Sequence, residues 1–486
     1  MGYLGIDLGT SAVKISYLDE EAKIQQSVSR SYPISYPKEG WAEQNPEDWW
    51  TAILSGIAEI VETDSYQGIR AIGVGGQMHG LVVLDADEQV IRPAILWNDT
   101  RTSAETTYLN QVIGQSALLE ETGNIAYAGF TAPKLLWMKK QEPEQYQKIR
   151  HILLPKDYIV FRLTGQFATD YSDASGTLLL NVRQRTWSQK LLEICQLDPV
   201  VLPRLLESSD LAGESRKELN QAWKLEKPAL VVAGAGDNAA AALSVGAVEE
   251  GDCNISLGTS GTVFMPARRF LQDEKSSLHA FADASGQFHL MGCTLSAASC
   301  YKWWMDQILE KPESTTLSTK EAVRHQALYF MPYLMGERSP LNDEAVRGAF
   351  LGLSPRVNWQ HMIYAIYEGV AFSLRDCVEI AKSMGLAIDQ VSLVGGGSKS
   401  AIWAQMMANV LNRPLLLPEG ERGPGHGAAL LAYACYHKLP IGRLAKDQAR
   451  FSKTYRPQAE EVPYYEKKYR RFQKLYPALR DFYQQG

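Results

Sequence analysis

The stretch that decides the fold runs from residue 229 to residue 264 and reads ALVVAGAGDNAAAALSVGAVEEGDCNISLGTSGTVF. An apolar run ends in glycines, Asp237 opens an alanine-rich segment, and a second apolar run is interrupted by Gly-Thr-Ser-Gly. A strand, a turn and a helix, followed by a strand-turn-strand unit, are typical of an α/β domain. The stretch therefore predicts two neighbouring sites, one at Asp237 and one at the Gly-Thr-Ser-Gly turn.

Asp237 allows more than one interpretation. Gly234, Gly236 and Ala239 match the dinucleotide fingerprint G-x-G-x-x-G/A. The charge of Asp237 argues against a bound dinucleotide, because the pyrophosphate would have to occupy the same helix N-terminus. Asp237 is then either an ordinary N-cap of its helix or a general base presented at the end of a strand.

The beginning of the chain carries a second copy of the hairpin. Residues 3–19 read YLGIDLGTSAVKISYLD and residues 254–266 read NISLGTSGTVFMP, each with Leu-Gly-Thr-Ser between two β-rich runs. A repeated unit of this kind predicts an internal duplication, in which Ser256 takes the position of Asp7.

We place the domain boundary near residues 246–252, which gives an N-terminal domain of residues 1–248 and a C-terminal domain of residues 249–486. Strands alternate with helices in both parts, so the predicted fold class is α/β. The charged stretch that ends near Lys227 is expected to be helical.

The composition is that of an ordinary globular protein. The 486 residues are 45% hydrophobic and 21% charged, and a formal net charge of −6 gives no nucleic-acid footprint. The six cysteines form no C-x-x-C pair and no metal-ligand spacing with the eight histidines. There is no apolar run long enough for a transmembrane helix. We therefore expect a cytoplasmic protein with no membrane partner; the oligomeric state is open, with a homodimer as one arrangement.

The two Gly-Thr-Ser turns predict a phosphate site. Small residues let backbone N–H groups and hydroxyls approach a phosphate closely, so Thr10 and Ser11 can face Gly258 and Thr259 across a triphosphate. The alternative is that each segment is only a tight hairpin turn, where glycine and serine are expected anyway.

Phosphoryl transfer needs positioning, a metal ion and a carboxylate that takes the proton of the acceptor hydroxyl. Asp7 could hold the hydrated metal, Lys14 could reach a phosphate oxygen, and Asp237 could be the base. His79, which follows Met78 in a glycine-rich loop, can recognise the hydroxyls of a small polyol, because imidazole both donates and accepts hydrogen bonds. A histidine that only satisfies its own loop is the alternative.

A triple glycine, Gly395–Gly397, follows the strand-like run QVSLV. It suits the close approach of a flat base or a ribose to the backbone, and a simple strand-to-helix turn is the alternative. A Walker loop around Lys399 is excluded by spacing, because Ser398 and Leu393 stand where that motif needs glycine.

Taken in order, the motifs resemble the FGGY carbohydrate kinases, and the resemblance covers essentially the whole chain. That family belongs to the wider group of sugar kinases, actin and heat-shock ATPases. The resemblance therefore implies two duplicated ribonuclease-H-like domains of the actin and hexokinase type with a central cleft. The segments that carry it are GIDLGTSAVK, WAEQNPEDWW, GQMHG, PAILWNDTR, GFTAPKLLW, LLPKDY, SDASGT, GDNAA, SLGTSG, LSAASC, PYLMGER, EGVAFSLRD and VGGGSKS.

Within the family the sequence is most similar to the kinases of the ketopentose D-xylulose. The resemblance implies phosphorylation of that sugar at its terminal hydroxyl by ATP and Mg²⁺, with Asp237 as the catalytic base. It implies Met78, His79 and Asn238 at the sugar and Asp7 near the metal. The residues that it implies at the nucleotide are Thr10, Ser11, Lys14, Gly258 and Thr259 beside the phosphates and Gly396, Gly397 and Ser400 beside the adenosine.

Two other functions remain open. A kinase for L-xylulose, ribulose or a hexulose would differ only in subtle pocket contacts, and the Met-His pair after Gln77 favours xylulose. A sugar or nucleotide sensor without catalysis would not need Asp237 and Asp7. One departure from the family pattern is His426 in GPGHGAAL, where an aliphatic residue is expected.

Overall fold

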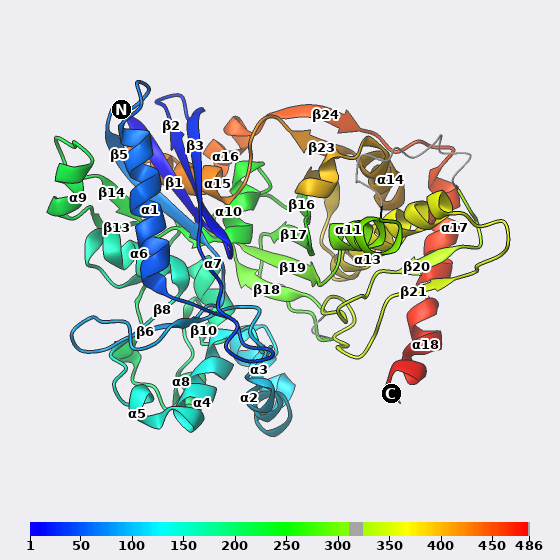
Figure 1. Ribbon diagram of the computed structural model, residues 1–486, viewed down its shortest axis with the longest axis horizontal. Coiled ribbons are helices and arrows are strands. Elements are labelled where there is room, and N and C mark those ends of the chain that lie inside the picture. The colour runs from blue at the N-terminus through cyan, green and yellow to red at the C-terminus, as the bar shows by residue number, and fades with distance from the viewer. Residues whose placement is uncertain (276, 311–323, 485–486) are drawn as a thin grey trace.

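The computed structural model describes residues 1–275, 277–310 and 324–484, and its two halves are each built on a seven-stranded sheet (Figure 1). The first sheet has the order β13-β14-β5-β1-β2-β3, and β15 also pairs with β5. Its strands are β1 (Gly2–Leu8), β2 (Ala12–Leu18), β3 (Ile24–Ser31), β5 (Ile69–Gly76), β13 (Leu211–Glu214), β14 (Leu230–Val232) and β15 (Ala235–Gly236).

The second sheet has the order β18-β19-β17-β16-β22-β23-β24. Its strands are β16 (Gly251–Leu257), β17 (Gly261–Ala267), β18 (His279–Ala282), β19 (Phe288–Thr294), β22 (Ile388–Val394), β23 (Leu415–Pro418) and β24 (Phe451–Tyr455).

The predicted duplication is confirmed by the pairing of the strands. β1 runs antiparallel to β2 and parallel to β5, and β16 runs antiparallel to β17 and parallel to β22. Asp7 is paired with Lys14 across the first hairpin, and Ser256 is paired with Thr262 across the second. β1 and β16 are buried along nearly their whole length, as expected for strands at the centre of a sheet.

The remaining strands form short two-stranded pairs outside the two sheets. They are β4 (Glu43–Gln44) with β7 (Ala94–Ile95), β6 (Val82–Leu84) with β8 (His151–Leu153), β9 (Ala168–Asp170) with β12 (Arg204–Leu206), β10 (Leu180–Asn181) with β11 (Thr186–Trp187), and β20 (Tyr329–Met331) with β21 (Ala349–Leu351).

The α-helices cover the sheets and the edges of the two halves. They are α1 (Pro46–Val61), α2 (Ser103–Thr107), α3 (Gln115–Thr122), α4 (Thr131–Gln141), α5 (Pro143–Tyr146), α6 (Pro155–Thr164), α7 (Tyr171–Ala174), α8 (Gln189–Cys195), α9 (Lys217–Ala222), α10 (Asp237–Ser244), α11 (Ala298–Trp303), α13 (Trp359–Ser383), α14 (Ala401–Leu411), α15 (Pro424–His437), α16 (Ile441–Gln448), α17 (Val462–Phe472) and α18 (Leu475–Gln484). Within the described ranges, no helix has both the length and the apolar character that a membrane crossing requires.

The helical interpretation of the charged stretch that ends near Lys227 is wrong. This stretch contains the short helices α8 and α9, but also β11, β12 and β13. β13 forms the edge of the first sheet, antiparallel to β14, so pairing with an existing strand decides the conformation of a segment whose side chains alone favour a helix.

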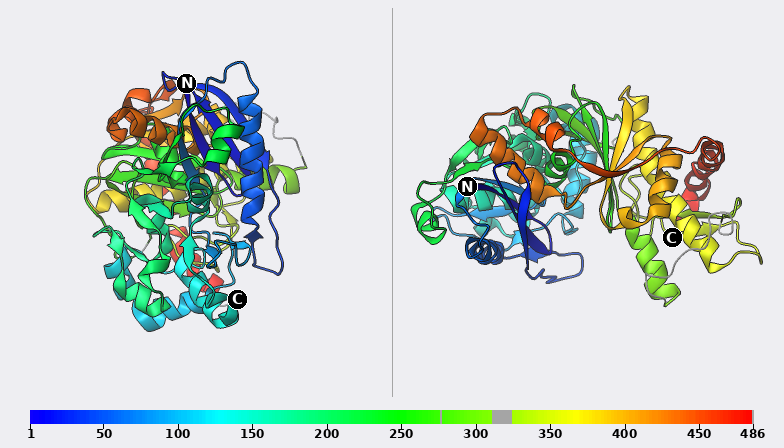
Figure 2. Two further views of the ribbon diagram at one scale, coloured as in Figure 1. Left: turned by 90° about the vertical axis from the view of Figure 1, so that its left-hand side faces the viewer. Right: turned by 90° about the horizontal axis from the view of Figure 1, so that it is seen from above.

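Helix α15 joins the two halves, because it comes late in the chain and yet packs on the first sheet. In Figure 1 it lies beside β1 and β5, and it contacts α10 as well. The contact is so close that a Cβ on Gly5 would lie 1.8 Å from the carbonyl oxygen of Gly425, and one on Gly73 would lie 2.0 Å from that of Ala428. α10 in turn contacts β17 of the second sheet, and a shared apolar cluster includes Tyr3 and Phe264. Figure 2 shows the two halves side by side, with α17 at the end away from the N-terminus.

The close packing of α15 predicts that a single added methyl group at Gly427 destabilises the protein. Gly427→Ala should destabilise the protein by roughly 3 kcal/mol, because the new Cβ would lie 1.8 Å from the carbonyl oxygen of Ala240. The matched control is Gly442→Ala in α16, where the nearest atom would be 3.9 Å away. There the higher helix propensity of alanine should leave the melting temperature equal or slightly raised. Thermal unfolding measures both, and equal melting temperatures for the two variants would contradict the packing argument.

Candidate active site

Asp237 lies at the carboxyl end of the short strand β15 and is the first residue of α10. The N-cap of this helix is Gly236, and no side-chain capping bond is made, so the interpretation of Asp237 as an N-cap is wrong. Asn238 instead donates two hydrogen bonds to Oδ1 of Asp237, from its backbone N–H (2.7 Å) and from Nδ2 (2.8 Å). Because both bonds end on Oδ1, Asn238 orients the carboxylate without using Oδ2.

Asp7 and Asp237 share one electrostatic environment. Burial raises the pKa of Asp237 to about 6, against the two bonds from Asn238, which lower it. Burial, together with the charge of Asp237, raises the pKa of Asp7 to about 7, against the charge of Lys14, which lowers it. A carboxylate with a pKa of about 6 is ionised at neutral pH and is still basic enough to accept a proton from a hydroxyl.

The predicted first phosphate loop connects β1 to β2. The N–H of Gly9 closes the loop on the carbonyl of Ala12 (3.1 Å), the hydroxyl of Thr10 accepts a bond from Nε1 of Trp97 (2.9 Å), and Ser11 is exposed. The ammonium group of Lys14 is paired with Glu421, which precedes α15. A segment of the second half of the chain thus reaches the loop of the first.

The predicted second phosphate loop connects β16 to β17 and lies against the triple glycine. The carbonyls of Gly258 and Thr259 accept bonds from the N–H groups of Ala298 (2.8 Å) and Ala297 (2.9 Å) at the start of α11. A Cβ on Gly397 would lie 2.5 Å from Cγ of Leu257, the residue before Gly258. The structure therefore brings Gly258 and Gly397 together.

The other members of the triple-glycine segment are less constrained. A Cβ on Gly396 would meet no atom within 4 Å, so this residue faces open space. Ser400 is the N-cap of α14, and its hydroxyl accepts a bond from the N–H of Trp403 (3.3 Å). The segment is a strand-to-helix turn in geometry, and it leaves Gly396 free to contact a ligand.

His79 is held in one protonation state and one tautomer. Its Nδ1 lies 2.8 Å from the carbonyl oxygen of Gly176, and because a carbonyl only accepts, Nδ1 carries the proton. Burial lowers the pKa of His79 to about 3, so the ring is neutral and Nε2 is only an acceptor. The backbone of His79 has a φ of +69°, in the left-handed region that non-glycine residues rarely adopt. Met78 packs on the turn before Asp237, since a Cβ on Gly236 would lie 3.0 Å from its Cγ.

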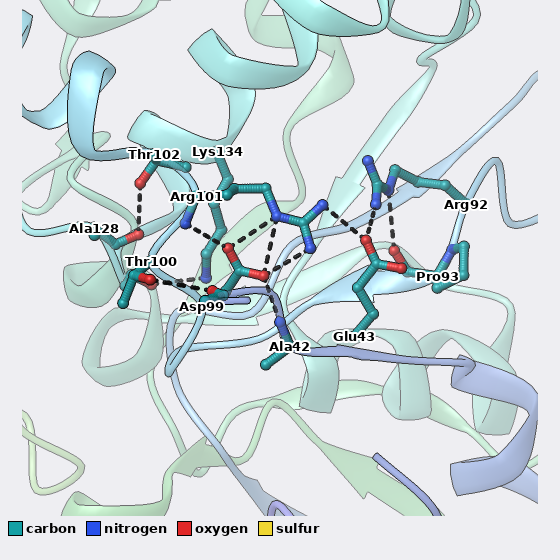
Figure 3. A network of polar contacts seen from close by, with 12 residues as sticks. Ala42, Glu43, Arg92, Pro93, Asp99, Thr100, Arg101, Thr102, Ala128 and Lys134 are labelled. Carbon is teal, nitrogen blue, oxygen red and sulfur yellow. Dashed lines mark hydrogen bonds and ion pairs between the residues drawn. The ribbon is translucent and has the colours of Figure 1, made fainter. Parts of the chain in front are cut away.

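A buried polar network, of which Glu43, Asp99, Arg101 and Lys134 are labelled in Figure 3, is bonded to the backbone of His79. The ammonium group of Lys134, which has no exposed surface, donates to the carbonyls of His79 (2.8 Å) and Gly129 (2.7 Å). Asp99 pairs with Arg101 through Oδ2 (2.7 Å), and Arg101 pairs with Glu43 (2.7 Å). Burial lowers the pKa of Lys134 well below its usual value, while the charge of Asp99 opposes this. The left-handed conformation of His79 is therefore stabilised by bonds to its own carbonyl.

The second half of the chain contributes residues around His79 that sequence reasoning missed. The ring of Phe281 lies 6.2 Å from the ring of His79, and the guanidinium of Arg338 lies 5.3 Å from the ring of Tyr127. Tyr127 also donates to Oδ1 of Asn342 (2.9 Å). In the sequence, Arg338 could have been suspected as a site residue, because it is a charged residue in a loop with glycine and proline. Phe281 could not, because an aromatic residue in a buried strand is expected in any protein core.

His426, the departure from the family pattern, is buried in the first turn of α15. Its Nε2 lies 2.9 Å from Nη1 of Arg422, which can only donate. Burial and the charge of Arg422 lower the pKa of His426 to about 3, so the ring is a neutral acceptor. At a position where the family pattern has an aliphatic side chain, this imidazole therefore orients Arg422, the residue after Glu421.

Two carboxylates of the candidate site suit a divalent cation. No group of three or more His, Cys, Asp or Glu side chains suited to hold a metal occurs among the residues that the structure describes. Asp7 and Asp237, in contrast, are two carboxylates whose mutual repulsion a cation would relieve. Mg²⁺ usually binds through one or two carboxylates, substrate phosphates and water, which agrees with this donor set.

Comparison with known proteins shows the family of the chain. Residues 2–244 match the N-terminal domain, and residues 253–435 the C-terminal domain, of the FGGY family of carbohydrate kinases. The chain belongs to this family. It is therefore a carbohydrate kinase of the two-domain actin and hexokinase type, as the sequence predicted.

Three relatives show how far the similarity extends. The xylulose kinase of Escherichia coli K12 is 38% identical over 98% of this chain and 99% of its own length. The crystal structure of a xyloylose kinase from Brucella ovis superposes with a TM-score of 0.94, at 38% identity and over 99% of this chain and 100% of that one. A gluconate kinase from Lactobacillus acidophilus superposes with a TM-score of 0.93, at 26% identity and over 99% of both chains. The fold alone thus does not distinguish the sugars.

The raised pKa of Asp7 predicts a pH-dependent effect on stability. Because its pKa in the folded protein, about 7, lies above the value in an unfolded chain, stability is lost as the pH rises towards 7. Without Mg²⁺ or nucleotide, Asp7→Asn should therefore raise the melting temperature by roughly 2–5 °C at pH 8 and by clearly less at pH 5.

Thermal unfolding in the presence of a chelator measures this difference. The exposed Asp64 provides the control, because Asp64→Asn should not change the melting temperature at either pH. The electrostatic interpretation is wrong if Asp7→Asn has the same effect at pH 5 as at pH 8.

Proposed function

We propose that this protein phosphorylates D-xylulose with ATP and releases D-xylulose 5-phosphate and ADP. The proposal is carried by one observation: Met78, the residue before His79, packs on Gly236, the residue before Asp237. This packing joins the loop of a neutral imidazole to the turn of an oriented carboxylate of raised pKa. The similarity over nearly the whole chain to xylulose kinases supports D-xylulose as the sugar.

Asp237 would act as the general base on the terminal hydroxyl of the sugar. As the oxygen attacks the γ-phosphorus in line, the hydroxyl proton passes to the carboxylate, and the bond from that phosphorus to the β–γ bridging oxygen breaks. Asn238 keeps Oδ1 in place during this transfer through its two bonds. Nε2 of His79, being only an acceptor, would take a hydrogen bond from a sugar hydroxyl.

The nucleotide would lie along the two loops that follow the duplicated strands. Lys14 would exchange Glu421 for a phosphate oxygen, and Asp7 would hold a hydrated Mg²⁺, which neutralises developing charge on the phosphoryl group when bound. Thr10, Ser11, Gly258 and Thr259 are the proposed neighbours of the phosphates, and Gly396, Gly397 and Ser400 those of the adenosine.

The proposed organisation follows from this assignment. We place the domain boundary between residues 248 and 249, so that Asp237 lies near the end of the N-terminal domain. α15, which belongs to the C-terminal domain, nevertheless packs on the first sheet. We place the protein in the cytoplasm. Closure of the two domains on the sugar would exclude water as a competing acceptor.

The main alternative is a kinase for another sugar. Pocket contacts that select one orientation of a hydroxyl change affinity without changing the fold, as the similarity to a gluconate kinase illustrates. L-xylulose, ribulose, a hexulose and gluconate are therefore the competing substrates.

A substrate panel tests the proposal. ADP release is coupled to an optical readout with D-xylulose, L-xylulose, D-ribulose, D-fructose, D-gluconate and glycerol as acceptors. D-xylulose should have the highest kcat/KM, and a higher value for any other member would overturn the specificity.

The role of Asp237 predicts a separation of catalysis from binding. Asp237→Asn should lower kcat by roughly 10²–10⁴-fold, because the amide cannot accept the hydroxyl proton. The dissociation constant of D-xylulose, measured by calorimetry, should change by less than about threefold, since asparagine keeps the shape and one acceptor oxygen. Retention of more than about a tenth of kcat would rule out Asp237 as the base.

A further inference from the structure

The turn that presents Asp237 is bonded to a buried charge cluster that lies outside the residues assigned above. Lys156, Asp157, Asp170 and Asp173 have no exposed surface. The ammonium group of Lys156 contacts Oδ1 of Asp157 (2.6 Å) and Oδ1 of Asp170 (3.0 Å). It also donates a hydrogen bond to the carbonyl of Ala233 (3.2 Å).

Asp170 gathers further donors on its second oxygen. Oδ2 of Asp170 accepts from the backbone N–H of Ser172 (2.8 Å), from its hydroxyl (2.5 Å) and from the hydroxyl of Ser208 (2.8 Å). The hydroxyl of Ser172 accepts in turn from the N–H of Gly236 (3.1 Å), the residue immediately before Asp237. The carbonyl of Ser208 accepts from the N–H of Gly234 (3.0 Å).

Three backbone groups of the catalytic turn, from Ala233, Gly234 and Gly236, therefore end on one network. Gly234 has a φ of +84°, and a Cβ there would lie 2.0 Å from the carbonyl oxygen of Val74, so the turn is held tightly on both sides. Ser172 lies in the segment of residues 170–177, which also contacts the proposed sugar site, because the carbonyl of Gly176 in this segment fixes Nδ1 of His79. Through Ser172 and Gly176, this one segment contacts both loops that carry the proposed chemistry.

We propose that Ser172, bonded to Asp170, which in turn contacts Lys156, is a positioning residue that sets the place of the Asp237 carboxylate. Its hydroxyl is the only side-chain link, in the part of the chain that the structure describes, between the cluster and the N–H of Gly236. Because Gly236 is the N-cap of α10, movement of this N–H moves the first helical residue, Asp237. A displacement of about 1 Å at the reacting groups can cost about 10²-fold in rate.

The experiment uses a matched pair of serines on the same segment. Ser172 and Ser175 are both fully buried, and each hydroxyl donates one bond and accepts one. Ser175 donates to the carbonyl of Tyr171 (2.7 Å) and accepts from the N–H of Ala282 (3.0 Å), so it does not contact the catalytic turn. Removal of Lys156 or Asp170 is avoided, because loss of one partner from a buried ion pair is strongly destabilising.

Ser172→Ala should lower kcat by roughly 10–100-fold, with KM for D-xylulose and for ATP within about threefold of the wild type. Ser175→Ala should keep kcat within about threefold, with a comparable fall in melting temperature. If Ser172→Ala is unfolded at the assay temperature, Ser172→Cys is used instead, because a thiol keeps the shape and bonds only weakly. The proposal is overturned if the folded Ser172 variant has the kcat of the Ser175 variant, or if its loss appears in KM alone.

The inference rests on the proposed function, and the two fail in different ways. An inactive wild type, or an Asp237→Asn variant with substantial activity, would remove the base and with it the function. An active wild type with an inactive Asp237→Asn variant, combined with equal kcat for the two serine variants, would remove only the positioning role of Ser172.

Discussion

The structure depends on the contact of one helix with one sheet at a distance that only glycine permits. α15 lies on β1 and β5 with backbone against backbone, at Gly5 and Gly73, and it packs on α10 through Gly427. The same contact brings the start of α15 to the active site, because a Cβ on Gly425 would lie 3.5 Å from Cβ of Asp7. Since β1 carries Asp7 and α10 begins with Asp237, the position of both carboxylates follows from this packing.

The chemistry of the site comes from how charges are buried. Asp7 and Asp237 have raised pKa values because burial outweighs the groups that lower them, which are Lys14 at Asp7 and the two bonds from Asn238 at Asp237. Lys156, Asp157 and Asp170 are withdrawn from water more completely, with no exposed surface, but they are ion-paired and hydrogen-bonded. An unpaired buried charge is costly, whereas a paired one orders its surroundings. Asp7 and Asp237 therefore suit a bound cation and a proton acceptor. The paired cluster suits a rigid support.

Much of the fold could be predicted because its signals are local. The hairpins at Leu8–Ala12 and Leu257–Gly261, the strand that ends at Gly76 and the helix that starts at Asp237 all follow from alternating apolar residues and small turn residues. The segment before Lys227 was predicted as helical because its charges favour a helix, and its conformation is decided by pairing of β13 with β14, which no local pattern records. The N-cap of α10 fell one residue from its expected place for a similar reason, since β15 continues to Gly236.

By itself, the sequence determined the class of fold and the duplication, and it predicted candidate site residues, because these depend on periodicity and on short motifs. Only the tertiary structure decided how those residues are held. The tautomer of His79 depends on Gly176, 97 residues away, and the turn before Asp237 depends on Ser172, 64 residues away. Such partners are set by the packing of separate elements, and a hydrogen bond between distant residues leaves no mark in either local sequence.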